Sequence, residues 1–396
     1  MKKKLFINTI IIIPILLLAA CNISRGFIEE ESIIINDNGN NANNAIDDNR
    51  NVMDSKIMLL SGSISDDEAA YYSAEKNVEI HGSDRIIHKS TPDYFYEEGW
   101  FNNFCLELLE DTTVKVLIIN PAIEHLPGMF EKIRITLPDI LIVTTRAYDV
   151  DNISEFADIV MYIDQLAVDR MIPEHAKKLG AKTFVYYSFP RHMEMPILAQ
   201  QRDLIEDICL EIGLKFVYVE AIDPANDISG AQQFIMRDVL RKVEEFGKDT
   251  CFLITSSYIQ ETLISSVLEQ EAIMAQPSYS PYYGFPEALS IDPDIENFWD
   301  PKWLNQQIAD KIADYGASGR IFAWPVPDSM LIGSAAVEYG LAYCEGLVSR
   351  QADKDMLVQC LQKAMEDFGY GDYGVNVNLA DGTDNYFLFT EDFITY

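Results

Sequence analysis

The stretch "KIMLLSGSISDDEAAYYSAEK", residues 56–76, contains the unit of strand and helix from which the fold is built. It begins with a continuous apolar run, passes through serines, and reaches an acidic segment at residues 66–68 that opens a helix. A strand without polar alternation must be covered on both faces, which is typical of parallel sheets. The stretch therefore predicts a buried β-strand followed by an α-helix.

The same alternation continues along the chain. Amphipathic stretches predict helices over residues 94–110, 168–179, 196–212, 230–246 and 258–275. Further apolar runs that predict strands read "RIIHKS", "VKVLIIN", "DILIVTT", "DIVMYID", "KTFVYYS", "KFVYVE", "TCFLITSS" and "RIFAW". Because strands alternate with helices, we expect an α/β fold with mainly parallel sheets flanked by helices.

Two proline-containing segments interrupt this rhythm and indicate two lobes. "SFPRHMEMP", residues 188–196, follows the sixth predicted strand, and "WPVPDSMLIG", residues 324–333, follows the ninth. We interpret both segments as crossings between lobes. Residues 56–188 are then a first α/β lobe and residues 189–330 a second. Residues 331–396 are expected to return to the first lobe as helices and to end in a terminal hairpin.

The N-terminal segment has the pattern of a targeting signal. Lysines at residues 2–4 precede a short apolar run, and "LAAC", residues 18–21, is similar to the bacterial lipoprotein signal. We expect residues 1–20 to be a lipoprotein signal peptide, Cys21 to be lipidated, and residues 21–55 to be a disordered Asn-rich tether. A plain signal peptide with a chance cysteine is the alternative. The expected location is the extracytoplasmic face of the cell membrane, reached through a lipid anchor.

Composition restricts the class of partner. The chain has 63 acidic against 30 basic side chains, a net charge of −33, which argues against nucleic acid as a partner. The cysteines other than Cys21 are irregularly spaced and include no CxxC pair, so neither a disulfide framework nor a metal site is predicted. The histidines are scattered and no catalytic signature is present. We therefore predict neither enzymatic activity nor a cofactor.

The N-terminal pattern and the two predicted lobes together resemble a known family. The lipoprotein-type N-terminus, the tether and the two lobes, with the segment "GRIFAWPVPDSMLIGSAAVEYGLAYCEG" at residues 319–346, resemble type I periplasmic-binding-protein-like solute-binding lipoproteins. Within that fold the chain looks similar to a group of uncharacterised bacterial lipoproteins distantly akin to the basic-membrane-protein branch. The resemblance implies capture of a small molecule between two lobes for an ABC-type permease or a sensor. Repressors share this fold, but the segment ahead of the lobes reads as a signal and tether rather than a helix-turn-helix.

Candidate ligand-binding residues follow from the rule that ligands bind at the carboxyl ends of parallel strands. Arg146 stands beside two threonines and could clamp a carboxylate or a phosphate, unless it is a surface arginine. Aromatic residues in the loop at residues 277–289 could stack on a flat ring or pack on their own lobe. The candidates are Ser61, Ser63, Asn120, Thr144, Thr145, Arg146, Asp164, Arg191, His192, Ser256, Ser257, Tyr282, Tyr283, Trp324 and Asp328.

The leading hypothesis is a membrane-anchored solute-binding lipoprotein with a small-molecule ligand. Two alternatives remain at this level. A surface adhesion or structural lipoprotein would have a filled cleft and no ligand. A surface enzyme would need a nucleophile or an acid–base pair that the sequence does not single out.

Overall fold

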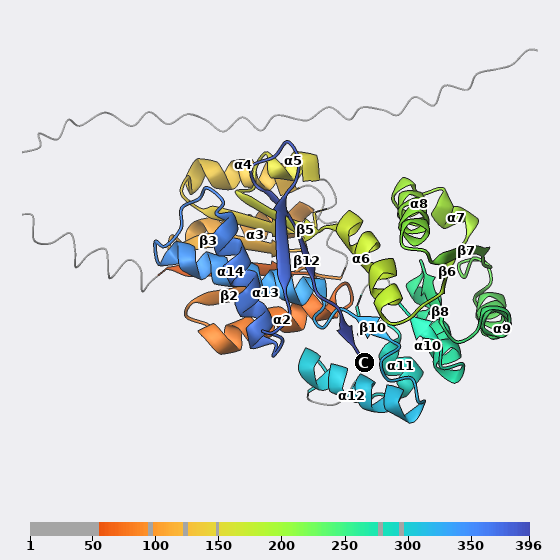
Figure 1. Ribbon diagram of the computed structural model, residues 1–396. Coiled ribbons are helices and arrows are strands. Elements are labelled where there is room, and N and C mark those ends of the chain that lie inside the picture. Colours follow the sequence, from red (N-terminus) through yellow and green to blue (C-terminus); the bar gives the residue numbers. More distant parts are fainter. Residues whose placement is uncertain (1–54, 94–97, 122–125, 148–149, 276–279, 293–296) are drawn as a thin grey trace, which may run out of the picture. The chain divides into compact units, whose positions relative to one another are not determined.

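The computed structural model describes residues 55–93, 98–121, 126–147, 150–275, 280–292 and 297–396 (Figure 1). Residues 47–396 form one compact unit. The predicted signal peptide, Cys21 and nearly all of the predicted tether lie outside the described residues. Among the helices that are described, none is both long enough and apolar enough to cross a membrane.

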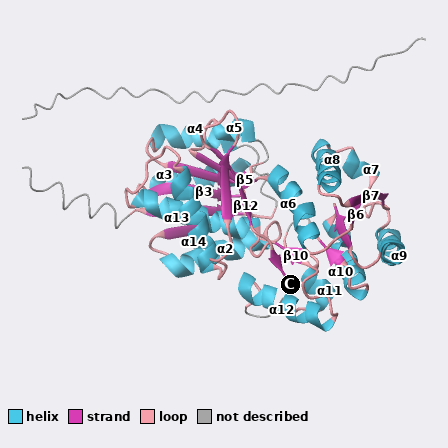
Figure 2. Ribbon diagram, viewed as in Figure 1, coloured by secondary structure: helices cyan, strands magenta, loops and turns pink. Residues whose placement is uncertain are grey.

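The first of two main sheets has seven strands in the order β11-β12-β5-β4-β3-β1-β2 (Figure 2). Neighbouring strands are parallel, except that β11 and β12 form an antiparallel hairpin. The predicted terminal hairpin is therefore confirmed, and β12 joins the sheet beside β5. The bounds are β1 Lys56–Ser61, β2 Ile86–Ser90, β3 Val114–Asn120, β4 Leu141–Thr145, β5 Ile159–Ile163, β11 Val375–Leu379 and β12 Tyr386–Glu391.

Helices cover both faces of the first sheet, and the side chains of β1 show why its sequence is continuously apolar. Ile57 and Leu59 join the core beneath α2, α13 and α14, whereas Met58 and Leu60 join the core beneath α3, α4 and α5. Successive side chains of a strand point to opposite faces, so both sets must be apolar. The helix bounds are α2 Glu68–His81, α3 Glu98–Glu110, α4 Leu126–Thr136, α5 Val150–Ser154, α13 Asp328–Cys344 and α14 Lys354–Asp367.

The second main sheet has four parallel strands in the order β7-β6-β8-β9. A two-stranded antiparallel sheet of β10 and β13 continues it through a bridge between Met274 and Ile321. The strands are β6 Thr183–Ser188, β7 Lys215–Glu220, β8 Thr250–Ile254, β9 Ile273–Met274, β10 Phe322–Ala323 and β13 Ile394–Thr395. The helices are α6 Gln165–Lys178, α7 Pro190–Met193, α8 Pro196–Glu211, α9 Ile228–Phe246, the 3-10 helix η1 Ser257–Ile259, α10 Gln260–Glu269, α11 Phe285–Leu289 and α12 Pro301–Asp314.

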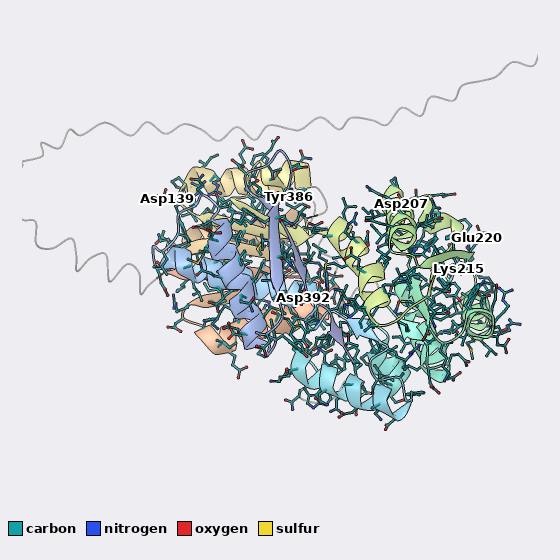
Figure 3. All side chains as sticks on the ribbon, in the orientation of Figure 1. Asp139, Asp207, Lys215, Glu220, Tyr386 and Asp392 are labelled. Carbon is teal, nitrogen blue, oxygen red and sulfur yellow. The ribbon has the colours of Figure 1, made fainter. Side chains whose placement is uncertain are left out.

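Three crossings between the sheets lie within the described residues, and one differs from the prediction. β6 pairs with β7 and β8, so the strand at residues 183–188 belongs to the second sheet and not to the first lobe. The first crossing therefore runs through α6, and residues 188–196 stay within the second sheet's half, where they form α7 and the start of α8. The predicted return at residues 324–333 is confirmed, because α13 packs on the first sheet. The third crossing, at residues 392–393 between β12 and β13, was not predicted; Figure 3 labels its Asp392.

Helix α13 approaches the first sheet closely through its glycines. Nearly every residue of this helix is buried. A Cβ at Gly340 would lie 3.0 Å from Ile57 Cδ1, and a Cβ at Gly333 would overlap the amide of Asn120. That amide donates a 2.8 Å hydrogen bond to the carbonyl of Ser329, one turn earlier in the helix. Glycine at residue 333 thus lets the helix and the end of β3 share a hydrogen bond.

Glu391 closes β12 immediately before the third crossing. Its side chain is completely buried, no side-chain hydrogen bond to its carboxylate is formed within the described residues, and the backbone amide of Val326 offsets only part of the cost of burial. Burial, with a smaller contribution from the charge of Asp328, raises the pKa of Glu391 well above its ordinary value. As pH rises past that ordinary value, the unfolded chain loses this proton before the folded chain does. The free energy of unfolding should therefore fall through this interval.

We predict that Gly333→Ala lowers the free energy of unfolding by about 1–3 kcal/mol, because the new methyl group displaces the Asn120 amide. Gly99→Ala in α3 is the control, since a Cβ there meets nothing within 4 Å. The control should gain up to about 1 kcal/mol from helix propensity. Urea denaturation measures both, and equal shifts would contradict the close approach.

We predict that Glu391→Gln is more stable than the wild type at about pH 8, by about 1–3 kcal/mol, and similar to it near pH 4. The amide cannot ionise, so the loss of stability with rising pH should be smaller in the variant. Urea midpoints across this range provide the measurement. Glu366→Gln, the same change at an exposed site, should keep the wild-type pH dependence. If the stabilities of wild type and Glu391→Gln change equally with pH, the raised pKa of Glu391 would be disproved.

Candidate functional site

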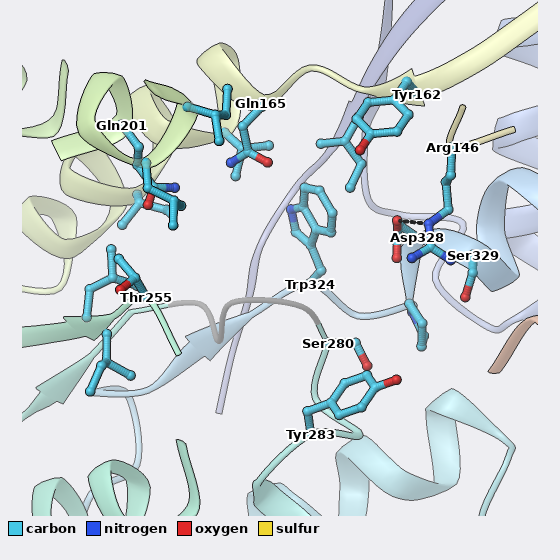
Figure 4. Close-up of a pocket in the computed structure, with 18 of the residues that line it drawn as sticks. Arg146, Tyr162, Gln165, Gln201, Thr255, Ser280, Tyr283, Trp324, Asp328 and Ser329 are labelled. Carbon is cyan, nitrogen blue, oxygen red and sulfur yellow. Dashed lines mark ion pairs between the residues drawn. The ribbon is translucent and has the colours of Figure 1, made fainter. Parts of the chain in front are cut away.

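A pocket of about 440 Å³ lies between the two main sheets (Figure 4). Its lining comes from the ends of β4, β5 and β8, the start of α2, helices α6 and α8, the return crossing, and the loop that contains Ser280 and Tyr283. The volume is within the range of roughly 300–1,000 Å³ found for small-molecule sites. Polar groups gather at two ends of the pocket, with aromatic and aliphatic side chains between them.

An arginine between two aspartates forms the first polar end. Arg146 follows β4 with a left-handed backbone, φ 52°, and its amide donates to the Met161 carbonyl over 2.8 Å. The guanidinium pairs with Asp67, and its Nε lies 3.1 Å from Asp328 Oδ2. Only 26% of the Arg146 side chain is exposed, so it is not a surface arginine. Two carboxylates neutralise its charge, which weakens the expectation that it clamps an anion.

The two aspartates have different environments. Asp67 caps α2 by accepting a 2.9 Å hydrogen bond from the amide of Ala70, and the same oxygen accepts from Ser329 Oγ over 3.2 Å. Asp328 begins α13 and lies largely buried beside the pocket. Burial raises the pKa of Asp328, and Arg146 opposes that rise. Asp328 is therefore a poorly solvated carboxylate at the pocket wall.

Two glutamines held by a buried aspartate form the second polar end. The side-chain amides of Gln165 and Gln201 donate to Asp169 Oδ1 over 2.9 and 2.6 Å. Gln201 Oε1 accepts from the Tyr186 hydroxyl over 2.9 Å. Asp169 is buried, which raises its pKa, and the two amide donors counteract this. The network fixes both glutamines at the pocket wall.

His192 and Thr255 lie at the same end. His192 Nδ1 is 2.8 Å from Thr255 Oγ1, which is also 3.0 Å from Ser188 Oγ. Burial, together with the nearby charge of Arg191, lowers the pKa of His192. The lowered pKa favours the uncharged imidazole, and this end has no lysine or arginine among its described lining residues.

Aromatic rings line the middle of the pocket, and further rings connect one of its loops to α2. Trp324 is 3% exposed, and Tyr283 is 47% exposed from the opposite loop. Next to Tyr283, Tyr282 stacks on Trp299 with centroids 4.8 Å apart. Trp299 stacks in turn on Tyr72 of α2 at 4.9 Å. This row of rings joins the loop of Tyr283 to a helix of the first sheet.

The structure brings together at the pocket five of the predicted residues: Arg146, His192, Tyr283, Trp324 and Asp328. Near the first sheet the remaining candidates make internal contacts. Asn120 donates to the Ser329 carbonyl and accepts from Thr145 Oγ1, while Thr144 is buried. Ser63 donates to Asp66. The acidic segment opens α2 as predicted, with Asp67 as the capping residue.

The other candidates near the second sheet also lie outside the pocket lining. Asp164 caps α6, and Arg191 forms a two-pronged ion pair with Asp223 at 2.8 and 3.0 Å. Ser256 precedes η1 and Ser257 begins it. Tyr282 is in the aromatic row. Cys21, the predicted lipidation site, is outside the described residues.

Ser61 belongs to a hydrogen-bond chain that resembles a hydrolase relay. Its Oγ lies 2.8 Å from His88 Nε2, and His88 Nδ1 contacts Glu75. However, Ser61 is 2% exposed, and its hydroxyl donates to the carbonyl of Gly62 over 2.8 Å. A nucleophile must reach its substrate. These hydrogen bonds therefore link β1, β2 and α2 and do not form an active site in this structure.

Several lining residues were not predicted from the sequence. The rule that ligands bind at the carboxyl ends of parallel strands does not select most of them. Gln165 and Gln201 lie on helices, Ser329 lies in the first turn of α13, and Asp67 is one of three consecutive acidic residues. Thr255 directly follows β8 and could have been found. Within the part of the chain that is described, no group of three or more His, Cys, Asp or Glu side chains could hold a metal ion.

The sequence is similar to a protein family and to two proteins of known sequence. The model of a family described as "Protein of unknown function (DUF3798)" matches residues 55–322. An uncharacterized protein of Treponema pallidum (strain Nichols) is 32% identical over 167 residues, 41% of this chain and 77% of that protein. A second uncharacterized protein of this organism is 32% identical over 142 residues, 35% of this chain and 64% of that protein.

The fold is shared with a solved structure. The crystal structure of a candidate transcriptional regulator from Clostridium difficile 630 has a TM-score of 0.79 at 21% identity, covering 87% of this chain and 99% of that one. A sugar ABC transporter protein from Actinomyces odontolyticus has a TM-score of 0.49 at 10% identity, covering 75% and 85%. The predicted fold class, α/β with mainly parallel sheets flanked by helices and of the type I periplasmic-binding-protein-like kind, is confirmed.

We predict that Tyr72→Ala and Trp299→Ala are coupled by about 0.5–1.5 kcal/mol in a double-mutant cycle, because each ring loses its stacking partner in the other variant. Urea denaturation of the wild type, both single variants and the double variant gives the coupling. As a control, Tyr72→Ala is combined with Tyr315→Ala, because Tyr315 caps the C-terminal end of α12 and takes no part in the row of rings. That pair should be additive within about 0.5 kcal/mol. Additivity in both cycles would contradict a stabilising row of rings.

Proposed function

The chain belongs to the family described as a protein of unknown function (DUF3798), and we propose that it is a solute-binding protein that encloses a small molecule between its two sheets. The observation that carries the proposal is the pocket itself. It is lined from both sheets, has polar groups at two ends, and has an aromatic wall between them. Such a combination suits reversible capture of a ligand that is held on several sides.

Closure of the two halves about the crossings is the proposed mechanism. Trp324, Pro327 and Asp328 come from the return crossing, and Gln165 comes from the first crossing. A ligand that contacts these residues together with Thr255 and Tyr283 would bind best when the halves are closed. Ligand binding therefore shifts the population towards the closed form by its difference in affinity.

The proposal extends to location and partners. The N-terminal pattern at residues 1–21 supports a signal peptide and a lipid anchor at Cys21. An anchored binding protein would deliver its ligand to an ABC-type permease or report it to a sensor in the same membrane. The net charge of −33 supports a small molecule over nucleic acid as the partner.

We predict that native mass spectrometry of the full chain, freshly purified in detergent, detects one small molecule per chain. Adding the identified compound back at about a hundredfold excess over Kd should stabilise the fold by roughly 2.7 kcal/mol, seen as a rise in Tm. Trp324→Ala should weaken binding at least about tenfold, because it removes the aromatic wall. Tyr315→Ala, an aromatic change outside the pocket lining, is the control and should bind normally.

The absence of a bound molecule, together with no rise in Tm for any member of a panel of sugars, nucleosides, amino acids and vitamins, would overturn the proposal. A structural or adhesive role at the surface would then be favoured. Equal loss of affinity in Trp324→Ala and Tyr315→Ala would place the ligand elsewhere.

A further inference from the structure

We infer that the ligand is an uncharged or cationic ring compound with hydroxyl or amino hydrogens at both ends, and that the pocket rejects phosphates and carboxylates. This inference rests on the proposed function, because it names the ligand class of that pocket. It also reverses the expectation from sequence that Arg146 selects an anion.

At the first end the charge balance is negative. Arg146 is the sole lysine or arginine among the described lining residues, and two carboxylates share it. With both aspartates ionised, the cluster carries one net negative charge. A phosphate placed beside it would meet two carboxylates and a guanidinium that is already paired. Like charges brought together at a binding site cost several kcal/mol, which is large enough to decide specificity.

Asp328 is the carboxylate available to a ligand. Asp67 already accepts hydrogen bonds from Ala70 and Ser329 in addition to its ion pair. Asp328 lines the pocket and its Oδ2 pairs with Arg146, while the backbone amides at the start of α13 partly stabilise its charge. It has lost most of its water through burial. Hydroxyl or ammonium hydrogens of a ligand would replace that water and stabilise the charge, because hydrogen bonds to an ionised acceptor are the stronger kind.

The second end has no lysine or arginine among its described lining residues and offers acceptors. Because the amide nitrogens of Gln165 and Gln201 donate to Asp169, their carbonyl oxygens face the other way. Gln201 Oε1 accepts from Tyr186, which leaves Gln165 Oε1 as the acceptor for a ligand. Burial lowers the pKa of His192 at this end, which favours its uncharged form. Nothing here would attract an anion, and a ligand hydroxyl or amine would find an acceptor.

Between the ends the pocket suits a ring. Figure 4 shows the Trp324 indole between the Gln165 end and the Arg146–Asp328 end. Tyr162 and Tyr283 add ring surface, and aliphatic lining comes from Ile163, Val168 and Leu198. An aromatic wall favours the apolar face of a sugar or a flat heterocycle over a linear chain. The volume of about 440 Å³ leaves room for one or two such rings.

The test is a set of matched compounds that differ in charge. The full chain in detergent is dialysed to equilibrium against an equimolar mixture of matched sets. The sugar sets are glucose with glucosamine and glucose 6-phosphate, ribose with ribose 5-phosphate, and galactose with galacturonate. The nucleoside sets are adenosine, guanosine and uridine, each with its monophosphate. Mass spectrometry reads the compounds retained. We expect retention of neutral or amino members, with each anionic counterpart bound at least about 100-fold more weakly.

The outcomes separate the two proposals. Preferred or equal retention of a phosphate or carboxylate would overturn the ligand class and leave the solute-binding function standing. Retention of no compound from any set would count against the solute-binding function itself, and so against the ligand class that depends on it.

The role of Asp328 is tested with the retained compound and its phosphate. Asp328→Asn keeps the shape of the side chain and removes its charge. The affinity for the neutral ligand should fall roughly tenfold, and the ratio of its affinity to that of the phosphate should decrease. Asp372→Asn makes the same charge change at an exposed loop outside the pocket lining and should leave both affinities unchanged. If Asp328→Asn keeps the wild-type ratio of affinities for the neutral compound and its phosphate, Asp328 is not the acceptor for the ligand. If that variant folds poorly, the retention measured with the wild-type protein decides the ligand class.

Discussion

The start of α13 is fixed against the carboxyl ends of β3 and β4, and the geometry of the pocket depends on this contact. Asn120 donates to the carbonyl of Ser329, Thr145 holds the other side of the same amide, and Gly333 makes the space. Ser329 Oγ also bonds to Asp67, which is already tied to Arg146. A helix that returns from the second half is thereby locked to two strands and to α2. Asp328 takes its position at the pocket from this lock.

Polar residues at the strand ends therefore have two different tasks. Those after β1 and β3, such as Ser61 and Asn120, hold the first sheet and its helices together. Arg146, after β4, has a left-handed backbone and lines the pocket. The strand-end rule selects both groups, since it states where polar residues gather and not what they contact. Only the packing of α13 distinguishes them.

Sequence alone predicted the strands well because burial on both faces leaves continuous apolar runs such as residues 57–60. It failed to predict which sheet receives β6, because "TFVYYS" has the same apolar character as the strands of the first sheet. The pocket was predicted in part for a similar reason. Trp324 and Asp328 stand out in a proline-rich crossing, whereas Gln201 is one polar residue among many on α8 and is marked only by its contact with Asp169.

The position of β12 has a consequence for how the protein is made. This strand joins the first sheet beside β5, although more than half of the chain separates the two in sequence. During synthesis the edge of β5 stays open until β12 arrives, and its backbone amides and carbonyls are available to any other chain in the meantime. A nascent or truncated chain is thus exposed to aggregation at this edge. Chaperones that shield it until translation ends would favour a high yield of folded protein.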